Sequence, residues 1–275
     1  MTAQVSMRAA TIDQYGSPEV LKVTEVKRPQ CGPDEILVVV RAASVNPYDW
    51  HKMTGTPLLL RIEGGWSKPK SNQLGIDVAG VVEFVGENIT KFAVGDEVFG
   101  CAEGTFADYV SVKNDTLVHK PDNISFEEAA AVPIGALTAV QGLRDHGQLK
   151  PGQHVLINGA SGGVGTYAVQ LAKYFGADVT GVCSTKNIEL VKSLGADHVV
   201  DYTTDDFTEN NKEYDLILDS MGNRKISHYK RCLKPLGTYV VIGAPKGRIF
   251  GPLPHMLKSL LAFKVGTRRS TTFMA

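Results

Sequence analysis

The sequence has no excess of charge and no long apolar run, and each absence excludes a class of protein. Basic and acidic residues balance at 29 each, so a net charge of zero favours neither nucleic acid nor a membrane surface as partner. No apolar run approaches the roughly 18 residues of a membrane-spanning helix, and the N-terminus lacks a signal-peptide pattern. We therefore expect a cytoplasmic protein without membrane insertion.

Cysteines are also scarce. The four that occur stand far apart, and none belongs to a C-x-x-C pair. This spacing argues against a zinc knuckle, and in a chain of 275 residues it gives no sign of a disulfide framework. The hydrophobic content of 43% is ample for a packed core, and the length allows one large domain or two ordinary ones.

The most informative stretch is His154–Gly165, HVLINGASGGVG, which precedes the apolar spacing of a helix. His154–Ile157 predicts a buried strand, and a glycine-dense turn follows it. In such a unit the helix N-terminus presents unpaired N–H groups and a positive dipole end to a phosphate. Ala160, Gly162 and Gly165 keep the G-x-G-x-x-G spacing, with alanine in the first place. A tight turn without a ligand would look similar, so the surrounding sequence has to decide.

Two patterns divide the chain. Up to about residue 124, short strands such as Glu35–Ala42 and Asp77–Val85 alternate with glycine turns, which indicates a small barrel-like β unit. Arg61–Gln73 has the composition of a surface loop. After a capping-box-like helix start at Ser125, strands alternate with helices, which predicts a parallel, doubly wound sheet. The expected strands are 154–157, 178–183, 198–201, 215–219 and 238–242, and the expected helices include 165–175, 187–194 and 224–233. We expect an α/β protein with domains 1–124 and 125–275.

Several longer motifs resemble the medium-chain dehydrogenase/reductase superfamily, and within it the zinc-independent quinone oxidoreductase-like branch. The matching runs are Ala43–Trp50, Leu74–Gly100, Ala129–Leu143, Leu156–Gly165, Leu190–Tyr202 and Asp215–Gly222. They stand in the right order and cover nearly all of the chain. The resemblance implies a GroES-like substrate domain, a Rossmann NADP-binding domain and NAD(P)H-dependent oxidoreductase activity.

The departures from the zinc-dependent relatives concern the metal. By the resemblance, those proteins carry cysteine where this chain has Asn46, Gly-His-Glu where it has Gly75–Asp77, and a further cysteine near Pro133. Asp77 alone among these positions offers a zinc donor, and a structural carboxylate is the favoured interpretation of it. We therefore expect no metal site. Without a Lewis acid, hydride transfer needs an acceptor activated by conjugation, such as a quinone or an α,β-unsaturated carbonyl.

Around the expected nicotinamide position, the resemblance places Asn46, Tyr48, His51 and Thr138. Asn46 is expected to hydrogen-bond the substrate oxygen or the cofactor ribose, and Tyr48 is a candidate proton donor. Thr138 is an expected cofactor contact. A turn residue, a packing tyrosine and a helix residue without a ligand are the alternatives for these three. His51 stands where some relatives have a proton-relay histidine, but a surface histidine is favoured in the absence of a zinc alkoxide.

The end of the second Rossmann strand bears on the coenzyme. NAD-specific proteins place Asp or Glu roughly 20 residues after the glycine turn, where it holds the ribose 2′-OH. Here Ser184, Thr185 and Lys186 occupy the place, and two hydroxyls and an ammonium suit a 2′-phosphate. An ordinary strand-to-helix turn fits the same residues. In the resembling branch, a tyrosine at the position of Tyr202 also packs or bonds there. NADPH is therefore favoured over NADH.

The remaining cofactor contacts follow from the loops after the strands. Ser161 and the amides of the glycine turn should bind the pyrophosphate, while Ile242–Ala244 and Ser220–Gly222 should line the cofactor as in the family. Glycines that merely terminate strands are the alternative for the last two. The expected cofactor-binding residues are Thr138, Ala160, Ser161, Gly162, Gly163, Val164, Gly165, Ser184, Thr185, Lys186, Tyr202, Ile242 and Gly243, and the expected catalytic residues are Asn46 and Tyr48.

The expected function is NADPH-dependent reduction of a small-molecule quinone or enone, and a homodimer is compatible with the family resemblance. A cofactor-binding protein with weak catalysis and a partner-interaction or redox-sensing role is the alternative. Chains of the resembling family return a final segment to the β domain, whereas this chain ends near the last Rossmann strand. We therefore expect an incomplete β domain, poor quinone reduction and association through an exposed edge.

Overall fold

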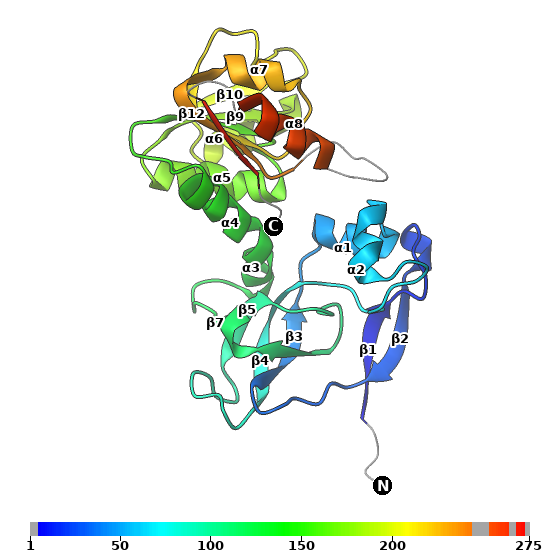
Figure 1. The fold of residues 1–275 in the computed structure, drawn as a ribbon. Helices are drawn as coiled ribbons and strands as arrows, with labels where there is room; N and C mark the ends of the chain where they lie inside the picture. Colours follow the sequence, from blue (N-terminus) through cyan, green and yellow to red (C-terminus); the bar gives the residue numbers. More distant parts are fainter. Residues whose placement is uncertain (1–4, 244–252, 264–267, 273–275) are drawn as a thin grey trace. The chain divides into compact units, whose positions relative to one another are not determined.

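The computed structural model describes residues 5–243, 253–263 and 268–272 (Figure 1). It divides into two compact units, Met1–Ile134 and Gly135–Ala275. The boundary predicted after residue 124 lies ahead of helix α3 (Phe126–Ala131), which contacts strand β4 (Asp77–Val85) of the first unit.

The first unit is mainly antiparallel β structure. Strands β1 (Ser6–Thr11) and β2 (Lys22–Lys27) form a hairpin. Among the described residues, a five-stranded sheet has the order β6-β3-β4-β5-β7. Its strands are β3 (Glu35–Ala42), β4, β5 (Glu97–Cys101), β6 (Tyr109–Lys113) and β7 (Leu117–His119). Ile36, Val38, Val78 and Val82 alternate along β3 and β4 and are buried in one cluster, as period-two patterning requires.

Short helices connect these strands. They are η1 (Pro18–Val20), α1 (Pro47–Thr54), η2 (Leu58–Leu60), α2 (Arg61–Gly64) and η3 (Asn114–Thr116). The predicted loop Arg61–Gln73 thus begins with one helical turn. The capping box predicted at the start of α3 is confirmed, because Ser125 Oγ accepts the Glu128 N–H at 3.1 Å and Glu128 Oε2 accepts the Ser125 N–H at 2.8 Å.

The second unit has the predicted parallel, doubly wound architecture. In its described part, six parallel strands lie in the order β10-β9-β8-β11-β12-β13. They are β8 (His154–Asn158), β9 (Asp178–Cys183), β10 (His198–Asp201), β11 (Tyr214–Asp219), β12 (Leu233–Val241) and β13 (Arg269–Thr272). The helical segments are α4 (Pro133–Val140), the π-helix η4 (Gln141–His146), α5 (Gly163–Tyr174), η5 (Thr185–Asn187), α6 (Ile188–Ser193), α7 (Ile226–Arg231) and α8 (Leu253–Phe263).

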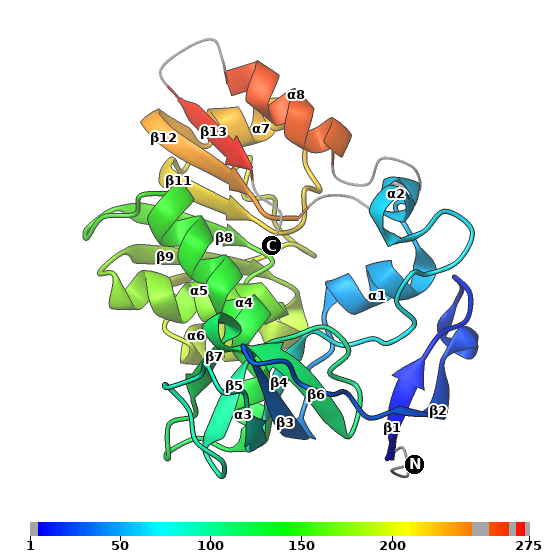
Figure 2. The same ribbon diagram turned by 60° about the horizontal axis from the view of Figure 1, so that its bottom comes forward.

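Helices cover both faces of this sheet. Val155 and Ile157 of β8 pack with residues of α5 and α6, whereas Leu156 between them packs with Tyr229 of α7. Figure 2 shows α8 beside α7 and β13. The alternation along β8 therefore places one helical layer on each face.

Two expectations about the end of this unit need correction. The strand predicted at 238–242 begins earlier, at Leu233, because Leu233 already pairs with Tyr214 of β11. Two further elements, α8 and β13, were not predicted from the sequence. Strand β13 extends the sheet, because its Thr271 pairs with Val240 of β12. Ala244 lies outside the described residues. No helix in the described ranges is both long and apolar enough to cross a membrane.

Candidate functional site

The glycine-rich turn between β8 and α5 needs its glycines for close packing. Gly159 has φ +91°, and a Cβ there would lie 2.4 Å from Ser220 Oγ. A Cβ on Gly165 would lie 2.1 Å from the Gly159 carbonyl oxygen, so this glycine lets the helix pack onto the strand. A Cβ on Gly163, by contrast, would meet nothing within 4 Å. The turn is thus packed on its inner side and open at Gly163.

Helix α5 begins at Gly163, two positions before the predicted start, with Gly162 as its N-cap. Its first turn therefore carries the amides of Gly163, Val164 and Gly165, which have no acceptor within the helix. The Gly162 N–H donates to the Gly159 carbonyl at 3.0 Å and is used inside the turn. Ala160 is fully buried, and its N–H donates to Val182 O at 3.0 Å. The first-turn amides are consequently the groups that the turn offers to an anion.

A buried carboxylate joins the loops that follow three neighbouring strands. Asp219, at the end of β11, is 0% exposed. Its Oδ1 accepts the Asn158 side-chain amide at 2.8 Å and the N–H groups of Met221 and Gly222 at 3.0 Å, and its Oδ2 accepts the Tyr239 hydroxyl at 2.6 Å. Backbone bonds from Ile242 and Gly243 reach the Asp219 carbonyl at 3.0 and 3.2 Å. Asp219 therefore holds the carboxyl ends of β8, β11 and β12 in one arrangement.

The loop after β9 contains the residues expected to choose the coenzyme. Asn187 Nδ2 donates to Ser161 Oγ at 3.0 Å and to Ser184 Oγ at 3.3 Å. Lys186 is exposed and has no hydrogen bond or ion pair with the part of the chain that the structure describes. The structure thus brings the two predicted serines to one amide and leaves the lysine turned to solvent.

A carboxylate that the sequence analysis missed lies beside this loop. Asp201 ends β10, pairs in register with Cys183, and accepts the Thr185 hydroxyl at 2.5 Å and the Thr203 hydroxyl at 2.7 Å. The Thr185 hydrogen bond and the Thr203 N–H lower the pKa of Asp201, so it is ionised at neutral pH. The loop itself has no carboxylate, as its sequence shows, but the neighbouring strand β10 brings one to it. Tyr202, next in the chain, is 51% exposed.

In the first unit, the predicted catalytic Asn46 belongs to a polar cluster around Asp77. The Asn46 side-chain amide donates to Asp77 Oδ2 at 3.0 Å and to Ser44 Oγ at 3.1 Å, while Ser44 Oγ donates to Asp77 Oδ2 at 2.8 Å. Asp77 is 0% exposed, and its Oδ1 accepts the Ile134 N–H at 3.3 Å. Asp77 thus has the hydrogen bonds of a structural carboxylate.

The Cys101 thiol donates a hydrogen bond to Asp77 Oδ1, with 3.6 Å between the sulfur and the oxygen. Burial, together with the charge of Asp77, raises the pKa of Cys101 to about 12. The Asp77 carboxylate already accepts hydrogen bonds on both oxygens, so a zinc ion would have to displace these bonds to coordinate it. Among the described residues, no group of three or more His, Cys, Asp or Glu side chains could hold a metal ion.

The other residues expected around the nicotinamide differ in exposure. Tyr48 is 39% exposed at the start of α1, and burial of its ring, with Glu103 and Asp49 nearby, raises the pKa of its hydroxyl. His51 is half-buried, with Nδ1 against the Thr56 carbonyl, so the expectation of a surface histidine is only partly met. Thr138 is 3% exposed.

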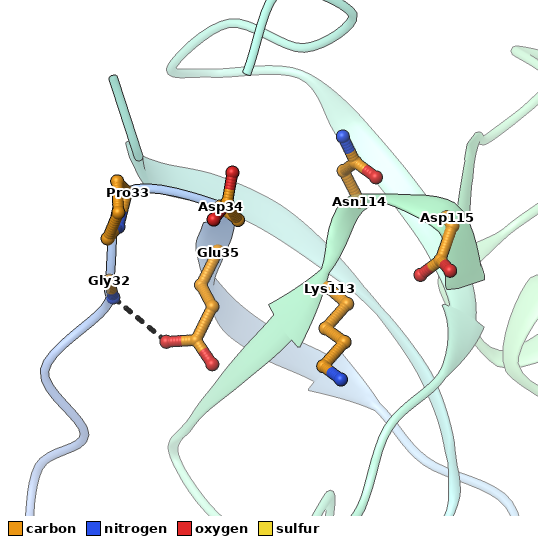
Figure 3. Close-up of a pocket in the computed structure, with 7 residues that line it drawn as sticks. All are labelled: Gly32, Pro33, Asp34, Glu35, Lys113, Asn114 and Asp115. Atoms are coloured by element: carbon orange, nitrogen blue, oxygen red, sulfur yellow. Dashed lines mark hydrogen bonds between the residues drawn. The ribbon is translucent and has the colours of Figure 1, made fainter. Parts of the chain in front are cut away.

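A surface hollow of about 540 Å³ lies elsewhere on the first unit (Figure 3). It is lined by Gly32, Pro33, Asp34, Glu35, Lys113, Asn114 and Asp115. None of these is an expected site residue, and Glu35 closes the adjoining turn by accepting the Gly32 N–H at 2.9 Å. The hollow therefore adds nothing to the candidate site.

Both units match known protein domains. An alcohol dehydrogenase GroES-like domain matches residues 32–122, and a zinc-binding dehydrogenase domain matches residues 163–273. The quinone-oxidoreductase homolog, chloroplastic, of Spinacia oleracea is 35% identical over 251 residues, and the match covers 85% of this chain and 74% of that protein. The solved quinone oxidoreductase from Coxiella burnetii has a TM-score of 0.85 and 30% identity, with 98% of this chain and 83% of that chain covered.

The chain belongs to the quinone oxidoreductase-like branch of the medium-chain dehydrogenase/reductase superfamily. Another similar protein is the NAD(P)H oxidoreductase RTN4IP1, mitochondrial, of Mus musculus, which is 38% identical over 261 residues. The match covers 87% of this chain, which spans just under two thirds (66%) of that relative. As a member of this branch, the chain has a GroES-like unit followed by a Rossmann unit, as its sequence predicts.

Proposed function

We propose that this quinone oxidoreductase-like chain binds NADPH and transfers hydride to a quinone or an α,β-unsaturated carbonyl without zinc. The observation that carries the proposal is the open first turn of α5 beside the Ser161–Asn187–Ser184 contact, which suits a pyrophosphate and a 2′-phosphate. The spinach and Coxiella relatives are named as quinone oxidoreductases, which supports a quinone as the hydride acceptor.

The residues present fit the dinucleotide. The amides of Gly163, Val164 and Gly165 would hold the pyrophosphate, and Lys186 with the Ser184 hydroxyl would hold the 2′-phosphate. The Asp201 carboxylate beside this loop would repel the 2′-phosphate. The preference for NADPH therefore requires that the attraction between Lys186 and the 2′-phosphate outweigh this repulsion. When bound, the nicotinamide supplies the hydride. Ile242, Gly243 and Thr138 remain proposed contacts.

In the first unit, Tyr48 is proposed to serve the acceptor and Asn46 the coenzyme. Tyr48 is protonated at neutral pH, as any tyrosine with an ordinary or raised pKa is, and its hydroxyl is proposed to donate a proton to a carbonyl oxygen. Asn46 is held in one orientation by Asp77 and Ser44, which take both of its amide hydrogens, so its Oδ1 is proposed to accept a hydrogen bond from a hydroxyl of the ribose. A conjugated acceptor needs no Lewis acid at this point.

The first test is coenzyme binding. Lys186→Ala should weaken NADPH binding by about 1–2 kcal/mol, the value of one charge-assisted contact, and leave NADH binding nearly unchanged. Lys192→Ala is the matched control, because Lys192 lies in α6 and contacts Glu189 at 3.0 Å. Calorimetric titration of both coenzymes measures the difference, and equal affinities in the unsubstituted protein would refute the NADPH assignment.

The second test is turnover of a panel of quinones and enals with NADPH. Oxidation of NADPH in step with acceptor reduction is the expected result. Tight NADPH binding without turnover of any acceptor would favour a cofactor-binding or redox-sensing protein instead. A cytoplasmic location remains a prediction, since the names of the mouse and spinach relatives assign those proteins to mitochondria and chloroplasts.

A further inference from the structure

We propose that Asn187 is a positioning residue that sets the Ser161 and Ser184 hydroxyls as donors toward the pyrophosphate and the 2′-phosphate of the coenzyme. The inference rests on the proposed NADPH function and goes beyond it, since it concerns a residue that is not itself an expected ligand contact. It starts from one side chain that joins two loops of the Rossmann unit.

The geometry is specific. Ser161 follows β8, Ser184 follows β9, and Asn187 ends the short turn η5. The Asn187 side-chain nitrogen lies 3.0 Å from Ser161 Oγ and 3.3 Å from Ser184 Oγ, and all three residues are half-buried. An amide nitrogen has two hydrogens and no acceptor lone pair, so it supplies one hydrogen to each serine.

The consequence concerns where each hydroxyl hydrogen points. A serine oxygen that accepts a bond from Asn187 keeps its own hydrogen for another partner. Ser161 then presents a donor beside the first turn of α5, and Ser184 presents one beside Lys186. Donors of this kind bind phosphate oxygens with charge-assisted hydrogen bonds. One neutral amide thereby prepares both serines for anions without adding charge.

Thr185 provides the internal contrast. Its hydroxyl donates to Asp201 Oδ2 at 2.5 Å, and its oxygen lies 2.9 Å from the Thr203 hydroxyl. The single hydrogen of Thr185 is thus committed to a carboxylate and is withheld from a phosphate. We therefore assign the 2′-phosphate to Ser184 and not to Thr185, although the two hydroxyls are neighbours in the chain.

The experiment uses the full chain and two probes, adenosine 2′,5′-bisphosphate and 5′-AMP. Asn187→Ala should weaken the bisphosphate about fivefold and 5′-AMP about twofold, because the first probe uses both serines and the second uses Ser161 alone. Asn187→Asp should weaken the bisphosphate further, since a carboxylate takes both serine hydrogens and repels the phosphates. Thermal unfolding of each variant controls for folding.

A double-mutant cycle separates positioning from a general structural effect. In a Ser161→Ala, Ser184→Ala background, Asn187→Ala should leave the affinity for both probes unchanged. An equal loss in that background, or full bisphosphate affinity in Asn187→Ala, would overturn the inference. If the unsubstituted chain binds neither NADPH nor the bisphosphate, the proposed function fails instead, so the two failures are distinguishable.

Discussion

Cys101 illustrates at the residue scale how a buried carboxylate sets the chemistry of its neighbour. Its thiol faces Asp77 and has its pKa raised from 9.0 to about 12 by burial and by the nearby charge. Because the pKa is raised in the folded state, the contribution of Cys101 to stability is complete below about pH 9. That contribution is lost as the pH rises from 9 toward 12, where the unfolded chain ionises first.

The expected result is a smaller alkaline loss of stability in Cys101→Ser, since serine does not ionise in this range. Urea unfolding at pH 8 and at pH 10.5 would measure the change for each protein. Cys31→Ser is a control, because the Cys31 thiol lies in another part of the unit and its pKa is raised to a lesser degree. Parallel losses in Cys101→Ser and the unsubstituted protein would contradict the assignment.

The donors around Asp77 lead to a second prediction at this scale. Asn46 and Ser44 both donate to Oδ2, so zinc would have to displace bonds that are already made. The purified protein should contain substoichiometric zinc, and treatment with a chelator should leave hydride transfer unchanged. Elemental analysis gives the metal content directly. One zinc per chain, retained against the chelator, would show that the cluster rearranges to bind metal.

At the scale of elements, the packing of α5 on β8 depends on one glycine. A Cβ on Gly165 would lie 2.1 Å from the Gly159 carbonyl oxygen, whereas one on Gly163 would meet open space. Gly165→Ala should therefore cost about 2–3 kcal/mol of unfolding free energy, and Gly163→Ala should be neutral or slightly stabilising. Denaturant unfolding compares the pair. A similar loss in both variants would mean that the helix start is not packed as described.

The carboxyl ends of β8, β11 and β12 are joined by the hydrogen bonds of Asp219. Asp219→Ala would leave the Met221 and Gly222 N–H groups and the Asn158 amide without their shared acceptor. The expected loss is about 3 kcal/mol, larger than that for Tyr239→Phe, which removes one donor. Chemical denaturation of the two variants would measure the difference. A larger loss of unfolding free energy in Tyr239→Phe than in Asp219→Ala would contradict this role of Asp219.

For the whole molecule, every expected cofactor contact except that of Asn46 with the ribose falls in one unit. Thr138 through Gly243 belong to Gly135–Ala275, so NADPH binding should stabilise this unit by about 2.7 kcal/mol at a hundredfold excess over Kd. Amide hydrogen exchange with and without NADPH should show the largest protection in the loops after β8 and β9. Protection confined to the first unit would contradict the proposed binding mode.

Much of the fold follows from local patterns in the sequence. The alternation of strands and helices after Ser125 predicts the parallel sheet, because a buried strand and an amphipathic helix have different periods. The glycine spacing predicts the turn at Gly159–Gly165, since a tight turn and close helix packing exclude side chains. The end of the unit was predicted less well: β12 begins at Leu233 through pairing with β11, the polar strand β13 has no strand pattern, and α8 was overlooked although its leucines have helical spacing.

The candidate site depended more on tertiary structure. Asp201 stands 16 residues from Thr185, and Asn187 stands 26 residues from Ser161, yet each pair is hydrogen-bonded. Parallel strands bring their carboxyl ends to one edge, so residues remote in the chain become neighbours there. The sequence by itself determined the family, the glycine turn and the residue types near the coenzyme. Only the tertiary structure decided which hydroxyls face a carboxylate and which face an amide, because that depends on strand order and register.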